Sequence, residues 1–137
     1  MSKTHDRLVS FVAGKMQRFG FEIRFMEGNH VDVKVNKPEL PGPIKTHRPD
    51  ILGTKGEAIG IGEAKTKNDL KSTRTKTQLI DFRNLVRNNP QNRLFLCVPQ
   101  TAEGELLRLL NQLGIDIDDQ IDIMIIPDVL LFSNGEI

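Results

Sequence analysis

Residues 47–66 read HRPDILGTKGEAIGIGEAKT, and this stretch decides the fold. A Pro-Asp pair opens a short strand over 50–52, a turn is predicted over 53–56, and a return strand covers 57–65. Glycine at both ends of so short a connection is typical of a β-hairpin. The stretch therefore predicts two antiparallel strands, the second of which ends in polar residues.

The polar end of the hairpin carries a possible metal site. Side chains alternate along a strand, so Glu63 and Lys65 are expected on one face and Ala64 on the other. Pairing across the turn brings Asp50 beside the low-60s positions. Two carboxylates on adjacent strands can share a hard cation such as Mg²⁺, which polarises a phosphodiester and activates water. A solvated strand end is the alternative interpretation.

Periodicity and punctuation predict the remaining elements. An apolar stripe predicts a helix over 4–18, Gly20 ends it, and alternation predicts strands after it. Helix caps are expected at Ser72 or Thr73 and at Thr101, with Gly114 ending the second of these helices. The predicted elements are strands 21–25 and 31–35, an exposed loop 36–45, helix 74–88, strand 93–98, a helix with core residues Leu106, Leu109, Leu110 and Leu113, and strand 121–126.

This order predicts the fold class as α/β, a three-layer αβα domain with a mixed central β-sheet. At 137 residues the chain is expected to form a single domain over 1–137. The core covers about 4–98, and 99–137 adds a C-terminal helix and strand. The apolar residues 129–132 are expected to pack in the core, with a terminal strand or a dimer contact as alternatives.

Composition restricts the class of protein. No apolar run approaches the roughly 20 residues of a membrane helix, and the N-terminal residues lack a secretory h-region. The one cysteine, Cys97, lies within a strand-like run and reads as a small core residue. We therefore expect a cytoplasmic protein with no membrane partner.

Charge is distributed unevenly along the chain. Residues 1–98 hold 18 Lys and Arg against 10 Asp and Glu, whereas residues 99–137 hold one against eight. Basic residues near the hairpin end are interpreted as a phosphate-binding rim, and a solvated loop and helix start is the alternative. The predicted nucleic-acid-binding residues are Arg48, Lys67, Lys71, Arg74 and Lys76.

The Pro49-Asp50 pair, the Glu63-Ala64-Lys65 triad and the surrounding order of elements together resemble the PD-(D/E)XK nuclease superfamily, which has a restriction-endonuclease-like core. The resemblance implies that Asp50 and Glu63 bind a metal, that the Ala64 carbonyl is a further ligand, and that Lys65 is the catalytic lysine. Gln78 matches the glutamine of a Q-x-x-x-Y element found in one branch of the superfamily. The resemblance therefore implies that Gln78 faces the site as a further catalytic residue.

The chain departs from the family pattern at two points. Phe82 stands where the glutamine motif has tyrosine, so only Gln78 is transferred. Many members carry an acid in the first helix that completes the metal site. Here only Asp6 is available in that helix, where it also suits the helix dipole, and Glu22 on the next strand is the other candidate.

Two further features leave alternatives open. Glycine weakens a strand, so Gly60 and Gly62 indicate either close approach of a nucleic-acid backbone or a packing constraint. His30 and His47 are potential metal ligands, but a lone histidine on a loop is more often without such a role.

The leading hypothesis is a Mg²⁺-dependent endodeoxyribonuclease, with Mn²⁺ as a substitute metal, whose partner is DNA. The alternative is a catalytically inactive nuclease-fold module that binds nucleic acid or acts as an interaction subunit. A homodimer or a larger nucleic-acid-processing complex is compatible with either hypothesis.

Overall fold

The computed structural model describes residues 3–27 and 47–131. Five strands form one sheet in the order β1-β2-β3-β4-β5. The first three strands pair antiparallel and the last three pair parallel, so the sheet is mixed. The elements are α1 (Lys3–Arg18), β1 (Glu22–Met26), β2 (Ile51–Lys55), β3 (Ala58–Ala64), α2 (Thr73–Val86), β4 (Arg93–Pro99), α3 (Glu103–Gln112) and β5 (Ile121–Ile126), with 3-10 turns η2 (Asp69–Lys71), η3 (Gln100–Ala102) and η4 (Asp128–Leu130).

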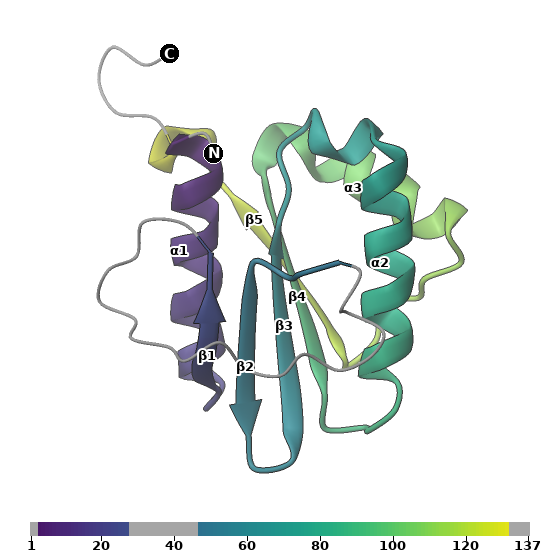
Figure 1. Cartoon of the computed structure of the whole chain (residues 1–137). Coiled ribbons are helices and arrows are strands. Elements are labelled where there is room, and N and C mark those ends of the chain that lie inside the picture. Colours follow the sequence, from purple (N-terminus) through teal and green to yellow (C-terminus); the bar gives the residue numbers. More distant parts are fainter. Residues whose placement is uncertain (1–2, 28–46, 132–137) are drawn as a thin grey trace.

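Helix α1 covers one face of the sheet, and α2 and α3 cover the other (Figure 1). Each face has its own apolar cluster, with α1 packed on one and α2 and α3 on the other. The predicted three-layer αβα architecture with a mixed sheet is thus confirmed. β5, from the predicted extension, pairs along its length with β4 of the predicted core.

Strand β4 is buried throughout except at its first residue, as expected for a strand covered on both faces. Cys97 is fully buried there, and burial raises the pKa of its thiol to about 12. The cysteine is therefore an inert core residue.

The hairpin is present, but its predicted turn over 53–56 is wrong. β2 continues through Gly53, which pairs with Gly60, and the connection is Gly56-Glu57. Gly56 has a φ of +60°, which supplies the left-handed conformation that a tight turn requires. Glycine is common in turns, but Gly53 is a strand residue that packs beneath α1.

Packing accounts for the two glycines of β3. A Cβ on Gly62 would lie 2.7 Å from Val12 Cγ1, and one on Gly60 would lie 2.9 Å from the Phe21 ring. The missing side chains thus let α1 and Phe21, which lies between α1 and β1, approach the sheet closely. The hypothesis that a nucleic-acid backbone approaches these glycines is not supported, because α1 already covers that face.

Two further expectations about the last third of the chain are wrong. Thr101 does not cap α3, because the chain enters that helix through η3, and the N-cap residue is Ala102. Residues 128–130 form a 3-10 turn instead of a strand, with Val129 and Leu130 exposed and Leu131 buried. Core packing therefore applies to Leu131 alone among the described residues of that segment.

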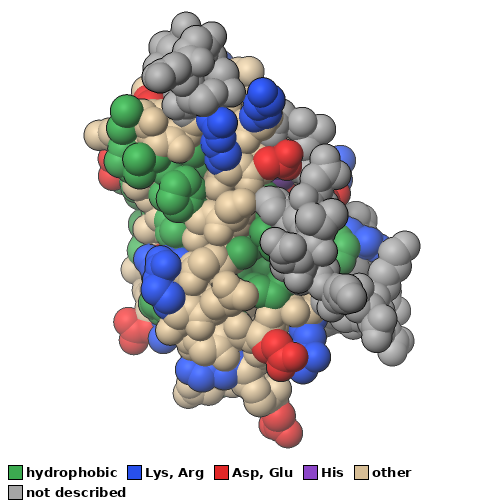
Figure 2. Space-filling model, turned by 90° about the vertical axis from the view of Figure 1, so that its left-hand side faces the viewer, with side chains coloured by type: hydrophobic (Ala, Val, Ile, Leu, Met, Phe, Trp, Pro, Cys, Tyr) green, Lys and Arg blue, Asp and Glu red, His purple; other side chains and the backbone are tan. Residues whose placement is uncertain are grey.

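The predicted strand 31–35, the loop 36–45, His30 and Phe132 lie outside the described residues. No helix in the described parts of the chain combines the length and apolar character needed to cross a membrane. Figure 2 shows the face formed by α1, where Lys and Arg side chains are interspersed with acidic, apolar and neutral ones.

Candidate active site

The site lies where β3 ends and β2 begins. β3 runs parallel to β4, so this is the carboxyl end of the parallel part of the sheet, where open α/β proteins commonly bind ligands. A cavity of about 410 Å³ opens there. Its walls come from α1, the end of β1, the hairpin, η2 and the first turns of α2, and its lining residues are His5, Glu27, Arg48, Asp50, Glu63, Ala64, Lys65, Thr66, Asp69, Ser72, Arg74, Thr75 and Gln78.

Asp50 and Glu63 extend the hairpin by one step beyond its backbone ladder. The Asp50 amide donates to Glu63 Oε1 at 2.8 Å, and the Ala64 amide donates to Asp50 Oδ2 at 2.8 Å. Each carboxylate therefore accepts a backbone hydrogen bond from the chain segment that carries the other carboxylate. Both side chains are buried, with Glu63 only 1% exposed.

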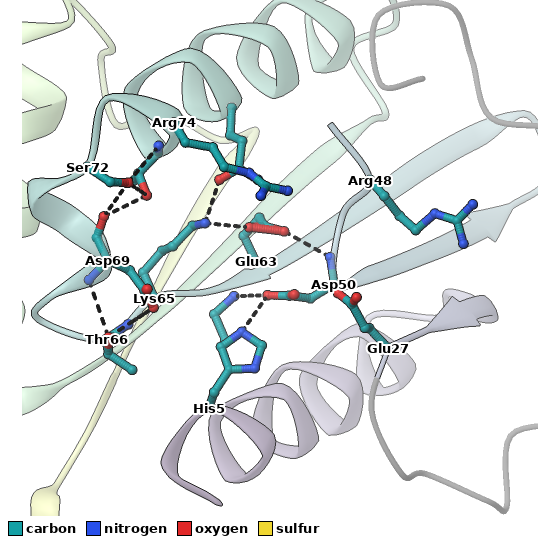
Figure 3. Close-up of a pocket in the computed structure, with 13 residues that line it drawn as sticks. His5, Glu27, Arg48, Asp50, Glu63, Lys65, Thr66, Asp69, Ser72 and Arg74 are labelled. Atoms are coloured by element: carbon teal, nitrogen blue, oxygen red, sulfur yellow. Dashed lines mark hydrogen bonds and ion pairs between the residues drawn. The ribbon is translucent and has the colours of Figure 1, made fainter. Parts of the chain in front are cut away.

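Lys65 lies on the same face of β3 as Glu63, as strand alternation predicts. Its Nζ is 3.2 Å from Glu63 Oε2 and donates a 2.6 Å hydrogen bond to Gln78 Oε1. Gln78 reaches the site from the buried face of α2. Figure 3 shows Lys65 beside Glu63, with Asp50 on the other side of Glu63.

Burial makes the charged form of Glu63 costly. Desolvation, reinforced by the neighbouring Asp50 carboxylate, raises the pKa of Glu63 to about 8, although Lys65 and the hydrogen bond from Asp50 act in the opposite direction. A cation bound nearby would therefore stabilise the charged form of Glu63, which burial disfavours.

Sequence reasoning missed His5, which contacts the site from α1. Its Nε2 lies 3.3 Å from Asp50 Oδ2, and this hydrogen bond raises the pKa of His5. The helical period contained the signal, because His5 precedes the buried Leu8 and Val9 by three and four residues and so continues their stripe. Asp6, the residue considered from sequence, does not line the cavity.

Glu27 was also missed. It follows β1 directly, and its amide donates to the Asp50 carbonyl at 2.8 Å. Burial and the adjacent Asp50 carboxyl, to which its side chain hydrogen-bonds, raise the pKa of Glu27. Glu22, the candidate from sequence, lies at the other end of β1 opposite Thr54, because β1 and β2 are antiparallel.

The loop after β3 is tied to α2 by a chain of hydrogen bonds. Asp69 Oδ2 accepts from the Thr66 amide at 2.8 Å, and the Asp69 carbonyl accepts from Thr75 Oγ1 at 2.7 Å. Ser72 caps α2 by accepting from the Thr75 amide, as predicted for that residue. These bonds fix the first turn of α2, and with it Gln78, relative to Lys65.

Two of the five predicted nucleic-acid-binding cations line the cavity. Arg48 stacks over the Phe25 ring at 4.9 Å, and Arg74 extends from the first turn of α2. Figure 3 shows these arginines flanking the carboxylates. Lys67 instead lies 3.6 Å from Glu105, and Lys71 and Lys76 line a separate hollow between α2 and α3.

Other candidates from sequence take different positions. His47 pairs with Asp81 of α2 at 3.3 Å and does not line the cavity. Phe82, which replaces the motif tyrosine, is fully buried in the cluster beneath α2. Within residues 3–27 and 47–131, no three His, Cys, Asp or Glu side chains are grouped so as to hold a metal ion.

Comparisons with known proteins add little to this geometry. No protein-family model matches the sequence, and no curated protein matches it. One solved structure is similar, a crystal structure of an XisH family protein from Nostoc punctiforme, with 15% sequence identity and a TM-score of 0.43 over 95% of this chain and 97% of that chain. A likeness this weak supports no conclusion about function.

Proposed function

We propose that the chain is a Mg²⁺-dependent nuclease that hydrolyses DNA phosphodiester bonds, with Asp50, Glu63 and Lys65 as its catalytic residues. Mn²⁺ is expected to substitute for Mg²⁺. The observation that carries the proposal is the ammonium group of Lys65 held between Glu63 and Gln78 in a cavity that also contains Asp50.

The donor set of the cavity suits Mg²⁺. It consists of hard carboxylate oxygens from Asp50 and Glu63, and the Ala64 carbonyl is the third ligand we propose. Mg²⁺ often binds proteins through one or two carboxylates and retains several waters, so it does not require a cage of three acidic or histidine side chains. When bound, the ion would polarise the phosphodiester and lower the pKa of a coordinated water.

Lys65 acts on the phosphate or on the attacking water. Its ammonium is a point charge with three donors, of which Glu63 and Gln78 occupy two. The remaining donor is available to a phosphoryl oxygen or to a water. Gln78 fixes the direction of the side chain, so the charge is already oriented when the substrate arrives.

The flanking arginines suit a polyanionic substrate. Arg48 and Arg74 are exposed cations on either side of the buried carboxylates. Guanidinium groups bind phosphate oxygens bidentately, and such contacts orient a nucleic-acid backbone without reading its bases. They also offset the repulsion between phosphates and the carboxylates.

A catalytically inactive nucleic-acid-binding module is the second candidate, and one observation favours it. Asp50 and Glu63 already accept backbone hydrogen bonds from each other's strands, so a structural role explains part of their burial. Lys65 is not explained by these backbone bonds, because its ammonium contacts the side chains of Glu63 and Gln78 instead.

Nicking of supercoiled plasmid DNA with Mg²⁺ or Mn²⁺ tests the proposal. Asp50→Ala and Lys65→Ala are each expected to lower the rate by about 10²–10⁴-fold, the range typical of lost catalytic groups. Lys55→Ala is the control, because Lys55 is an exposed cation at the other end of the hairpin. Cleavage that both site variants retain would contradict the site, and DNA binding without cleavage would favour the inactive module.

A further inference from the structure

A second hollow lies beside the candidate site, between η2, α2 and α3. Its volume is about 460 Å³. The buried side chains of Leu70 and Leu109 contribute to it, and exposed polar side chains make up most of its lining. The lining residues are Leu70, Lys71, Lys76, Glu105, Arg108, Leu109 and Gln112.

The hollow is strongly basic. Lys71, Lys76 and Arg108 are all exposed. The one acid among its lining residues, Glu105, lies 3.6 Å from the ammonium of Lys67, so a fourth cation offsets its charge. The positive potential is therefore not cancelled locally.

The position of Arg108 is informative because of its sequence context. It is the single Lys or Arg within residues 99–137, a segment with eight acids. That lone cation lies opposite two lysines from the basic part of the chain. Two distant segments of opposite overall charge thus contribute cations to the same hollow.

The hollow is continuous with the candidate site along the chain. Within η2, Asp69 lines the catalytic cavity, and Leu70 and Lys71 line the hollow. The first turns of α2 repeat this division, because Arg74 lines the cavity and Lys76 lines the hollow. A flexible polyanion leaving the cavity past Arg74 would meet these cations next.

We infer that this hollow binds the continuation of the DNA strand whose phosphodiester occupies the catalytic cavity. The inference rests on the proposed nuclease function. Three cations carried by three different elements, η2, α2 and α3, fit a chain of repeating phosphates better than a single anion. None of the described residues that line the hollow is aromatic, so the strand is held through its backbone charge and not by base stacking.

Removing the three cations tests the inference. The test variant is Lys71→Gln/Lys76→Gln/Arg108→Gln, and the control is Arg18→Gln/Lys55→Gln/Arg87→Gln, which removes three exposed cations at the opposite ends of α1, β2 and α2. Fluorescence anisotropy measures binding of single-stranded DNA of about 4 and about 16 nucleotides, which brackets common single-strand site sizes. Chelator in the buffer prevents cleavage.

The longer oligonucleotide is expected to bind the test variant about 10–100-fold more weakly at moderate salt. Its salt slope is expected to fall by about two, since each lost phosphate contact on a single strand contributes about 0.7. The short oligonucleotide and the control variant are expected to change little. If the triple variant does not fold, Arg108→Gln alone should lower the slope by about 0.7.

Equal slopes for the test and control variants would overturn the inference. So would wild-type protein that binds polyglutamate through these cations but does not bind DNA, because the hollow would then accept an acidic protein segment. Binding is measured without cleavage, so the two proposals can fail separately. DNA binding that depends on the cations of the hollow, by a protein that never cuts DNA, would contradict only the nuclease proposal.

Discussion

The two faces of β3 differ although they belong to one strand. The face beneath α1 presents Gly60, Gly62 and Ala64, which are small enough for the helix to pack closely. The opposite face presents Ile61, Glu63 and then Lys65, towards α2. One face serves packing, and the other combines packing with the candidate chemistry.

The difference explains how a small domain can hold buried charges in a fixed geometry. Close packing against Gly62 brings the side of α1 that carries Val12 onto the sheet, and the same stripe of α1 brings His5 to Asp50. Rigid packing on one face thus supports the orientation of charged groups at the other. Substitutions on the two faces should therefore fail in different ways.

The largest effect is expected on the charged face. Glu63→Gln should lower metal-dependent cleavage by about 10²–10⁴-fold while preserving the fold, because the amide keeps an oxygen that can accept from the Asp50 amide. Plasmid nicking measures the rate, and circular dichroism measures the fold. Loss of activity accompanied by unfolding would mean that Glu63 acts mainly as a structural residue.

The second-largest effect is also expected on the charged face, where the titration of Glu63 should make the free energy of unfolding depend on pH. Burial raises the pKa of Glu63 from about 4.5 to about 8, so between these pH values the folded protein binds more protons than the unfolded chain. The free energy of unfolding in chelator should therefore fall as pH rises through this window, and the raised pKa values of Glu27 and His5 act in the same direction.

Urea denaturation at pH 5.5 and pH 8 measures this trend. Glu63→Gln should be less dependent on pH than wild type, because its amide does not titrate. Mn²⁺ should stabilise wild type more at pH 8 than at pH 5.5, since the metal competes with the proton for the carboxylate. Stability that rises with pH in chelator would contradict the assigned direction.

Much of the candidate site follows from local sequence patterns. Strand alternation predicts that Glu63 and Lys65 share a face, and hairpin pairing predicts that Asp50 lies beside them. The glutamine motif predicts that Gln78 faces the site, and the 2.6 Å contact with Lys65 agrees with it. Each of these predictions depends on residues within one hairpin or one helix.

The missed residues depend on relations between distant elements. The helical period places His5 on the apolar stripe of α1, but its contact with Asp50 depends on how α1 is rotated and positioned on the sheet. The position of Glu27 depends on the antiparallel pairing of β1 with β2. The role of Gly62 depended on which helix covers it, a tertiary property that glycine content alone does not reveal. The predicted turn is likewise in the wrong place, because a glycine at position 53 is compatible with either a turn or a strand, and pairing with Gly60 makes it a strand residue.

A smaller effect is expected on the packed face. Gly62→Ala should destabilise the protein by about 1–3 kcal/mol, because the added methyl would lie 2.7 Å from Val12 Cγ1 and 2.9 Å from Met16 Sδ. Gly14→Ala is the matched control. Its added Cβ would lie 3.6 Å from Arg18 Nη1, an ordinary contact, and alanine favours a helix over glycine by about 1 kcal/mol. Urea denaturation should give opposite signs for the two variants, and equal effects would disprove the packing explanation.

The smallest effect is expected at His5, which links the two faces. Its Nε2 contacts Asp50 Oδ2, the same oxygen that accepts from the Ala64 amide, so we expect it to act by positioning the carboxylate. His5→Ala should lower the cleavage rate about tenfold, equivalent to roughly 1.4 kcal/mol. It should also raise the Mn²⁺ concentration needed for half-maximal rate, because Asp50 becomes less well oriented.

Two companion variants separate this role from a general loss of stability. His5→Gln retains a side-chain N–H donor and should recover most of the rate and of the metal dependence. Asp6→Asn changes the neighbouring residue, which does not line the cavity, and should leave both unchanged. A His5→Ala variant with normal metal dependence and a lower melting temperature would reduce His5 to a packing residue of α1. Recovery by His5→Gln would instead mean that a hydrogen bond from α1 to Asp50 sets the geometry of the carboxylates at the end of β3.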